Sequence, residues 1–301
     1  MTTGVLLMTY GAPSGDDDLP RYLTAVRGGH APDESLVSEM RRRYARIGGS
    51  PLIRITVAQA RALESALGAG WIAAAGMRFS APSVAEAAAG LAARGAARIV
   101  GICMSPQWSP LLMGGYARDL EAAARSSGMP SAMAGAWYRE ESFIASVAVR
   151  VRDALAERDA FVLLTAHSLP RRVFDTEPDY VAQLRATGDL VAAAARLDAD
   201  RWAWAYQSAG HTQEDWLRPD LVELFPGLAA QGETDVLVVP VQFVSDHLEV
   251  LFDLDVAAAD QARAVGLRYR RIAMPNTDPG FVGSLAHVAR ATAGSLLGPV
   301  V

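Results

Sequence analysis

Short apolar runs alternate with longer segments of helical periodicity along the whole chain. Residues 4–9, 98–104, 160–166 and 235–243 are almost continuously apolar, as is typical of strands that are buried on both faces. In the segments between them, apolar residues recur every three or four positions, which is the spacing of an amphipathic helix. This alternation predicts βαβ units and therefore an α/β fold with parallel sheets.

The same alternation places each element and shows that the pattern starts twice. Strands are expected at residues 4–9, 71–79, 98–104 and 131–136, and again at 160–166, 201–207, 235–243 and 267–272. Helices are expected at residues 16–27, 33–46, 52–67, 84–94, 116–126 and 140–156, then at 179–196 and 219–231, from 246 onward, and at 279–296. We interpret the restart as two doubly wound domains, residues 1–143 and 144–301, with the last helix expected to pack back on the first domain.

Composition excludes several chemistries. All 28 basic residues are arginine, the net charge is -5 and Cys103 is the single cysteine. Without lysine, the chain has no amine for Schiff-base catalysis and no Gly-Lys-Ser/Thr phosphate loop. One cysteine cannot build a zinc ribbon, a disulfide framework or a protein-ligated iron–sulfur cluster.

Charge and hydropathy also bear on partners and location. The acidic balance argues against nucleic acid as a partner. The N-terminus lacks the charged region of a signal peptide, and the apolar run at 236–244 is far shorter than a membrane span. We therefore expect a cytoplasmic protein with no membrane span.

Candidate chemistry lies just after the predicted strands, because ligands bind at the carboxyl ends of the strands in open parallel sheets. None of these turns contains G-x-G-x-x-G, so a dinucleotide site is not expected. His167 directly follows the strand at 160–166, and Ser168 and Pro170 mark an abrupt end to that strand. It is either a turn histidine bonded to backbone or an imidazole that projects from the sheet edge, and we favour the second.

Three carboxylates follow the strand at 235–243. Asp246, Glu249 and Asp253 have the spacing of one helix face, which is usually a solvated surface. Their helix is otherwise apolar, so we expect them to line a wet cleft instead. A row of acids would raise the pKa of at least one member and attract a cation. With a neutral imidazole opposite, the donor set suits iron(II) or a similar divalent ion, in transit rather than permanently held.

Aromatic residues accompany these polar groups. Tyr10, after the first strand, is either a turn residue or a phenolate able to ligate iron. Trp108, Tyr116 and Trp216 are candidates for core packing or for the walls of a flat aromatic ligand.

Six motifs in order carry a family resemblance. The sequence contains VLLMTYGAP at 5–13, YLTAVRGG at 22–29, RRRYARIGGSPL at 41–52, TAHSLP at 165–170, YQSAGHTQEDWLRPD at 206–220 and VPVQFVSDHLEVLFDLD at 239–255. Through these the chain resembles the ferrochelatases from about residue 4 to 281. The resemblance implies two Rossmann-like chelatase domains, with a cleft between them in which iron(II) enters a porphyrin and two pyrrole protons leave.

The resemblance also implies roles for individual residues. His167 and Glu249 fall on the family's catalytic and metal-binding positions. The family's porphyrin-contacting positions fall on Tyr10, Arg27, Arg43, Tyr44, Ser50 and Tyr116. We add Trp216 as a wall of the cleft and Arg78 as a further guanidinium near a strand end. Guanidinium groups match the carboxylates of a porphyrin with four propionates.

The tyrosine in the first motif resembles the branch of the family that metallates coproporphyrin III, and the polar segment 28–34 lacks the apolar lip of membrane-associated relatives. The resemblance therefore implies coproporphyrin III as substrate and coproheme as product in heme biosynthesis. The alternatives are a protoporphyrin IX ferrochelatase, a sirohydrochlorin chelatase and a non-catalytic porphyrin- or heme-binding protein of this fold. We expect Fe(II) as a substrate, no permanently bound cofactor, no iron–sulfur cluster and a monomer.

Three positions depart from the family pattern. Gln107 stands where a histidine is common, Phe79 where some members carry a histidine or a bulky polar aromatic residue, and Ala257 where the carboxylate row often continues. These departures bear on a secondary metal-relay site and on metal preference.

Overall fold

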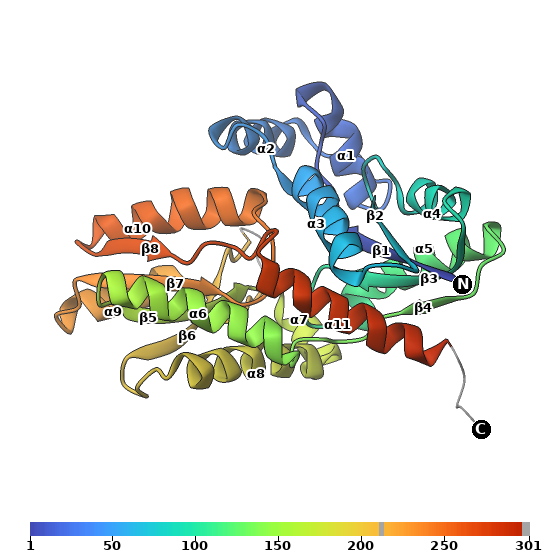
Figure 1. The fold of residues 1–301 in the computed structure, drawn as a ribbon. Coiled ribbons are helices and arrows are strands. Elements are labelled where there is room, and N and C mark those ends of the chain that lie inside the picture. Colours follow the sequence, from blue (N-terminus) through green and yellow to red (C-terminus); the bar gives the residue numbers. More distant parts are fainter. Residues whose placement is uncertain (211–213, 297–301) are drawn as a thin grey trace.

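In the computed structural model, which describes residues 1–210 and 214–296, the chain forms two four-stranded parallel sheets (Figure 1). Part of the motif at 206–220 lies outside the described residues. The first sheet has the order β2 (Trp71–Met77), β1 (Thr2–Thr9), β3 (Ala96–Cys103), β4 (Ser131–Met133). The second sheet has the same relative order, β6 (Trp202–Gln207), β5 (Phe161–His167), β7 (Asp235–Pro240), β8 (Arg268–Arg271).

Helices connect the strands. In the first half they are η1 (Asp16–Asp18), α1 (Leu19–Val26), α2 (Glu34–Arg46), α3 (Leu52–Leu67), α4 (Val84–Ala93) and α5 (Pro110–Ser126), and α6 (Glu141–Glu157) leads from the first half to the second sheet. In the second half they are α7 (Arg171–Thr176), α8 (Pro178–Ala195), α9 (Leu221–Ala230), the π-helix η2 (Glu249–Ala258), α10 (Ala259–Ala264) and α11 (Pro279–Ser295). The expected fold class, α/β with two doubly wound parallel sheets, is confirmed.

The second sheet is covered on both faces, which explains its continuous apolar strands. Val162 and Leu164 belong to one apolar core, whereas Leu163 between them belongs to another. Successive side chains of a strand point to opposite faces, so a strand with a core on each side needs apolar residues throughout. The larger of these two cores continues into the first sheet.

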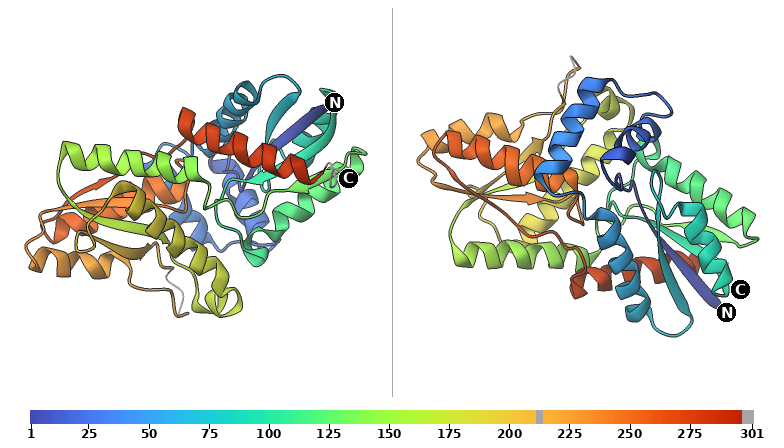
Figure 2. Two further views of the ribbon diagram at one scale, coloured as in Figure 1. Left: turned by 60° about the horizontal axis from the view of Figure 1, so that its bottom comes forward. Right: turned by 90° about the horizontal axis from the view of Figure 1, so that it is seen from above.

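The C-terminal helix joins the two halves. α11 contacts α3 from the first half and α6 beside the second sheet, and it starts near the middle of the molecule and runs along the first half (Figures 1 and 2). The division of the chain at residue 143 stays a prediction. In the part of the chain that the structure describes, no helix is long and apolar enough to cross a membrane.

Several predicted boundaries were wrong. The strands predicted at 71–79 and 131–136 end at Met77 and Met133, and the helix predicted from 116 begins at Pro110. Ser109 caps that helix by accepting a hydrogen bond from the Leu112 N–H, and proline is well suited to the first helical position. The helix predicted at 16–27 divides into η1 and α1, and α7 was not predicted.

The segment after β7 differs most from its prediction. An α-helix was expected from residue 246, but the helix begins at Glu249 and is a π-helix as far as Ala258. A π-helix closes wider turns with i→i+5 hydrogen bonds and is rare outside functional sites. Because the helix begins at Glu249, it holds Glu249 and Asp253, and Asp246 lies before it.

Candidate functional site

The order of each sheet fixes where a ligand can bind. Chain order reverses between β1 and β3 in the first sheet, and between β5 and β7 in the second. Open α/β sheets bind ligands beyond the carboxyl ends of the strands at such switch points. Tyr10 follows β1, His167 ends β5, and the segment after β7 leads to Glu249. The topology therefore directs these three residues to corresponding edges of the two sheets.

His167 is held so that one ring nitrogen stays free. Its Nδ1 lies 2.6 Å from the Ser168 carbonyl oxygen. A carbonyl can only accept, so we assign the hydrogen to Nδ1, which leaves the lone pair of Nε2 available to a metal or a proton. The backbone N–H of His167 donates to Gln242 Oε1 at 2.8 Å.

Glu249 is the acidic partner in the same site. Its side chain is 43% exposed, and Oε2 lies 3.6 Å from His247 Nε2. Burial opposes ionisation of Glu249, but the nearby imidazoles of His167 and His247 outweigh it and lower the pKa of the carboxyl to about 2. Glu249 is therefore an anion at neutral pH, ready to attract a dication.

His247 is a neighbour of Glu249 that the sequence analysis did not select. Its Nδ1 lies 2.9 Å from the Ser245 carbonyl oxygen, and its ring meets Phe243 edge-on at 4.5 Å. Burial disfavours the charged ring, but the Glu249 carboxylate more than compensates and raises the pKa of His247. Its position two residues before Glu249 in the sequence could have identified it as a neighbour of that carboxylate.

Asp253 reaches the same site from η2. Burial and then the Glu249 charge raise the pKa of Asp253, against the lowering effects of Ser208, His167 and Arg43. Its Oδ1 lies 3.4 Å from Arg43 Nη1 on α2. A contact 210 residues apart in sequence thus joins the two halves over the site.

Asp246 does not belong to the row of carboxylates, so the expected shared face is wrong for this member. Its Oδ1 accepts from Arg271 Nη2 at 3.0 Å, and its Oδ2 accepts from Asn276 Nδ2 at 2.7 Å. Asp246 precedes η2, where no helical turn aligns it with Glu249 and Asp253. It therefore anchors the start of the segment.

An aromatic wall comes from the first half. The Tyr10 ring lies 5.1 Å from Phe79 and 6.1 Å from Tyr116, centroid to centroid. The Arg78 guanidinium covers both Phe79 and Tyr116 at about 5 Å. Burial and, among the charges, Glu249 raise the pKa of Tyr10, although Arg78 lowers it. Tyr10 is 43% exposed whereas Tyr116 is 3% exposed, so Tyr116 supports the wall from behind.

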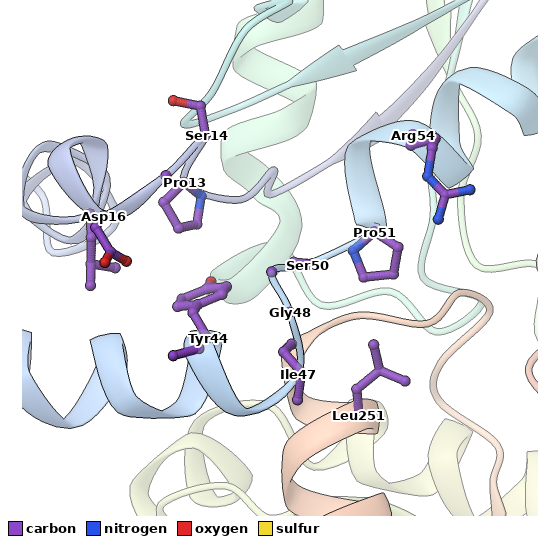
Figure 3. A pocket seen from close by; sticks show the side chains of 14 residues that line it. Pro13, Ser14, Asp16, Tyr44, Ile47, Gly48, Ser50, Pro51, Arg54 and Leu251 are labelled. Atoms are coloured by element: carbon purple, nitrogen blue, oxygen red, sulfur yellow. The ribbon is translucent and has the colours of Figure 1, made fainter.

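A cavity of about 690 Å³ is lined mainly by residues of the first half (Figure 3). Tyr44, Ser50 and Arg54 line it from the first half, and Leu251 lines it from η2. Burial and the nearby Glu249 charge raise the pKa of Tyr44 to about 12, so its phenol is neutral.

The other residues that the sequence analysis selected have varied surroundings. Arg27 is exposed at the end of α1, and Arg43 is engaged with Glu39 as well as Asp253. Trp216 packs its ring against Gly210, beyond β6. Trp108 is partly buried, with its backbone N–H and carbonyl bonded to the Gln183 side chain.

The contacts of Gln107 show the role of this residue, which stands where a histidine is common in the family. The side chain is buried, and Nε2 donates to Thr187 Oγ1 at 2.9 Å and to the Val241 carbonyl at 3.4 Å. It ties the loop after β3 to α8 and to the end of β7 and therefore acts structurally here. Ala257 lies on η2, and its methyl side chain offers no polar group that could continue the row of carboxylates.

The arrangement provides an imidazole and a carboxylate without a closed ligand set. Among the described residues, no group of three or more His, Cys, Asp or Glu side chains is placed to hold a metal ion. Two donors with an open side suit a metal that acquires its other ligands from a second molecule.

Comparison with known proteins shows the family to which the chain belongs. The Ferrochelatase family model matches residues 2–293. A ferrochelatase from Deinococcus radiodurans is 37% identical over 297 residues, covering 95% of this chain and 94% of the relative. A coproporphyrin III ferrochelatase from Geobacillus thermodenitrificans is 36% identical over 301 residues, covering 95% of each.

Solved structures share the architecture. SirB from Bacillus subtilis with Fe3+ superposes with a TM-score of 0.62 at 10% identity, covering 99% of this chain and 98% of that one. CbiX, described as the terminal enzyme of siroheme biosynthesis in denitrifying bacteria, gives a TM-score of 0.57 at 13% identity, covering 97% and 99%. At this identity the likeness concerns the fold alone. The family match along nearly the whole chain, together with these relatives, shows that the protein belongs to the ferrochelatase family.

Proposed function

We propose that this protein is a lyase that inserts iron(II) into coproporphyrin III and yields coproheme in the cytoplasm. The observation that carries the proposal is that His167, held through its Nδ1, and the ionised Glu249 lie near each other and near Tyr10. Relatives from Geobacillus thermodenitrificans and Listeria monocytogenes are named coproporphyrin III ferrochelatases, at 36% and 33% identity. We propose a monomer with no resident cofactor.

The reaction exchanges one dication for two protons. Iron(II) forms bonds to the four pyrrole nitrogens, two of which lose an N–H proton, so the charge balances. Glu249, with a pKa of about 2, holds a proton poorly and instead attracts the entering iron. His167 offers the Nε2 lone pair and is placed to accept a pyrrole proton.

The aromatic and basic residues of the first half supply porphyrin binding. Tyr10 presents an exposed ring suited to lie against the macrocycle, on the wall formed with Phe79 and Tyr116. Arg27 and Arg78 offer guanidinium groups to propionates, which they can bind through paired N–H donors. Four propionates provide more such pairs than the two of protoporphyrin IX.

The test compares anaerobic iron(II) insertion into coproporphyrin III and protoporphyrin IX. His167→Ala and Glu249→Gln should each lower insertion by on the order of 100-fold or more, with porphyrin affinity retained. His287→Ala is the matched control, because this histidine is exposed on α11 and pairs with Glu140. Near-normal turnover in His167→Ala would contradict the assignment, and equal or better activity with protoporphyrin IX would contradict the substrate.

A further inference from the structure

The backbone of His167 is held by the Gln242 side chain at the point where the pairing of β5 with β7 ends. The last register pair between β5 and β7 is Thr165 with Pro240, and the Val241 N–H donates to the Thr165 carbonyl at 2.9 Å. If this parallel ladder continued, the His167 N–H would donate to the Val241 carbonyl. That carbonyl instead accepts from Gln107, and the His167 N–H donates to Gln242 Oε1 at 2.8 Å.

The other end of the Gln242 amide is also fixed. Its Nε2 donates to the Tyr180 hydroxyl at 2.9 Å, and Tyr180 on α8 is 1% exposed. Burial raises the pKa of Tyr180, so the hydroxyl stays neutral. The amide cannot be reversed without placing its NH₂ against the His167 N–H. The side chain therefore has one orientation, with its oxygen toward His167.

The residue after His167 is held independently. The Ser168 N–H donates to the Gln207 carbonyl at 2.7 Å, and the Ser168 hydroxyl donates to the Leu217 carbonyl at 2.9 Å. Ser168 in turn accepts from His167 Nδ1 and so sets the rotation of the ring. Gln242 and Ser168 thus hold the histidine from opposite ends, one through its backbone and the other through its imidazole.

We propose that Gln242 is a positioning residue for metal insertion, which holds the His167 backbone so that Nε2 faces the porphyrin. The inference rests on the proposed function of His167. It predicts that loss of the Gln242 amide slows the chemical step more than porphyrin binding or folding, because small displacements of a reacting group are costly. A purely structural role would instead lower thermal stability and leave kcat of the folded protein intact.

The experiment uses three variants of the full chain. Gln242→Met keeps the length of the side chain but removes both hydrogen bonds. Gln242→Glu restores an acceptor for the His167 N–H and can accept from the Tyr180 hydroxyl. Gln231→Met is the control, since Gln231 is exposed at the end of α9. The measurements are kcat and KM for iron(II) insertion into coproporphyrin III, porphyrin Kd by fluorescence, Tm, and amide hydrogen exchange at His167.

In Gln242→Met we expect kcat to fall on the order of tenfold, with Kd and Tm near the parent values and faster exchange at the His167 amide. Gln242→Glu should recover most of kcat, and Gln231→Met should match the parent. A parent-like kcat in Gln242→Met overturns the inference, as does a loss of kcat that simply follows Tm. A parent protein that inserts no iron overturns the proposed function instead, so the two failures are distinguishable.

Discussion

A methyl group at Gly115 should displace the Arg78 side chain and leave the fold intact. A Cβ added to this α5 residue would lie 2.3–2.4 Å from three guanidinium atoms of Arg78. These atoms form the far end of a flexible side chain, so Arg78 can retract. The adjacent Gly114 is the matched control, because its added Cβ would meet only the Arg118 guanidinium, at 3.4 Å.

The contacts of Arg78 give the size of the effect. Its stacking on Phe79 and on Tyr116 contributes about 0.5–1 kcal/mol for each ring, and its ion pair with Asp119 adds at most about 1 kcal/mol. Retraction therefore costs about 1–3 kcal/mol. Alanine gains about 0.5–1 kcal/mol over glycine within a helix at either position. Gly115→Ala should thus unfold a few degrees below Gly114→Ala.

Porphyrin binding provides the second measurement. If Arg78 binds a propionate, loss of a charge-assisted hydrogen bond of about 1.5–3 kcal/mol should raise the coproporphyrin III Kd by roughly tenfold or more. Thermal unfolding by circular dichroism and fluorescence titration measure the two effects. In an Arg78→Met background, Gly115→Ala should no longer destabilise, because its clash partner is gone. Equal Tm and equal Kd for the Gly114 and Gly115 variants would refute the reasoning.

Three further predictions concern groups away from the chemical step. Burial raises the pKa of the Cys103 thiol to about 12, so Ellman's reagent should label it only after unfolding; rapid labelling of the native protein would contradict its burial. Asp246→Asn should lower the midpoint of urea unfolding, because it removes the charge that faces the largely buried Arg271. It should leave KM for iron(II) unchanged, and a raised KM would show that Asp246 does contribute to metal binding. The Arg268 hydrogen bond lowers the pKa of Asp235 to about 2, so its stabilisation is present above about pH 4 and is lost as pH falls through 2. Urea unfolding of Asp235→Asn should show a deficit at neutral pH that shrinks below pH 4, and a deficit independent of pH would disprove the ion-pair origin.

The architecture follows from local sequence patterns. Continuous apolar strands alternating with amphipathic helices are a short-range property, and a sheet buried on both faces requires them. The rule that ligands bind at strand ends then placed His167, Tyr10 and Glu249 near one site without any side-chain coordinates. Roles for Arg27 and Ser50 came only from the resemblance to ferrochelatases, because nothing in their spacing points to a porphyrin.

The type of the helix after β7 could not be predicted from the local pattern of apolar residues. Apolar residues around 246–258 fit a helix, but α and π turns differ in which residues share a face. The π-helix brings Glu249 and Asp253 to the site together with His247, whereas Asp246 turns to Arg271. The expected row of three acids was wrong because the helix begins only at Glu249, so Asp246 lies before it and pairs with Arg271 and Asn276 instead.

The sequence by itself determined the fold class, the strand ends that carry the chemistry and the family to which the chain belongs. The tertiary structure decided which partners those residues have. His167 is positioned by Gln242, 75 residues away, and Arg43 is engaged by Asp253, 210 residues away. Such contacts form only when two sheets and their helices have packed, so they depend on distances in space that no local periodicity contains. For the same reason, the protonation and orientation of the site are properties of the folded chain.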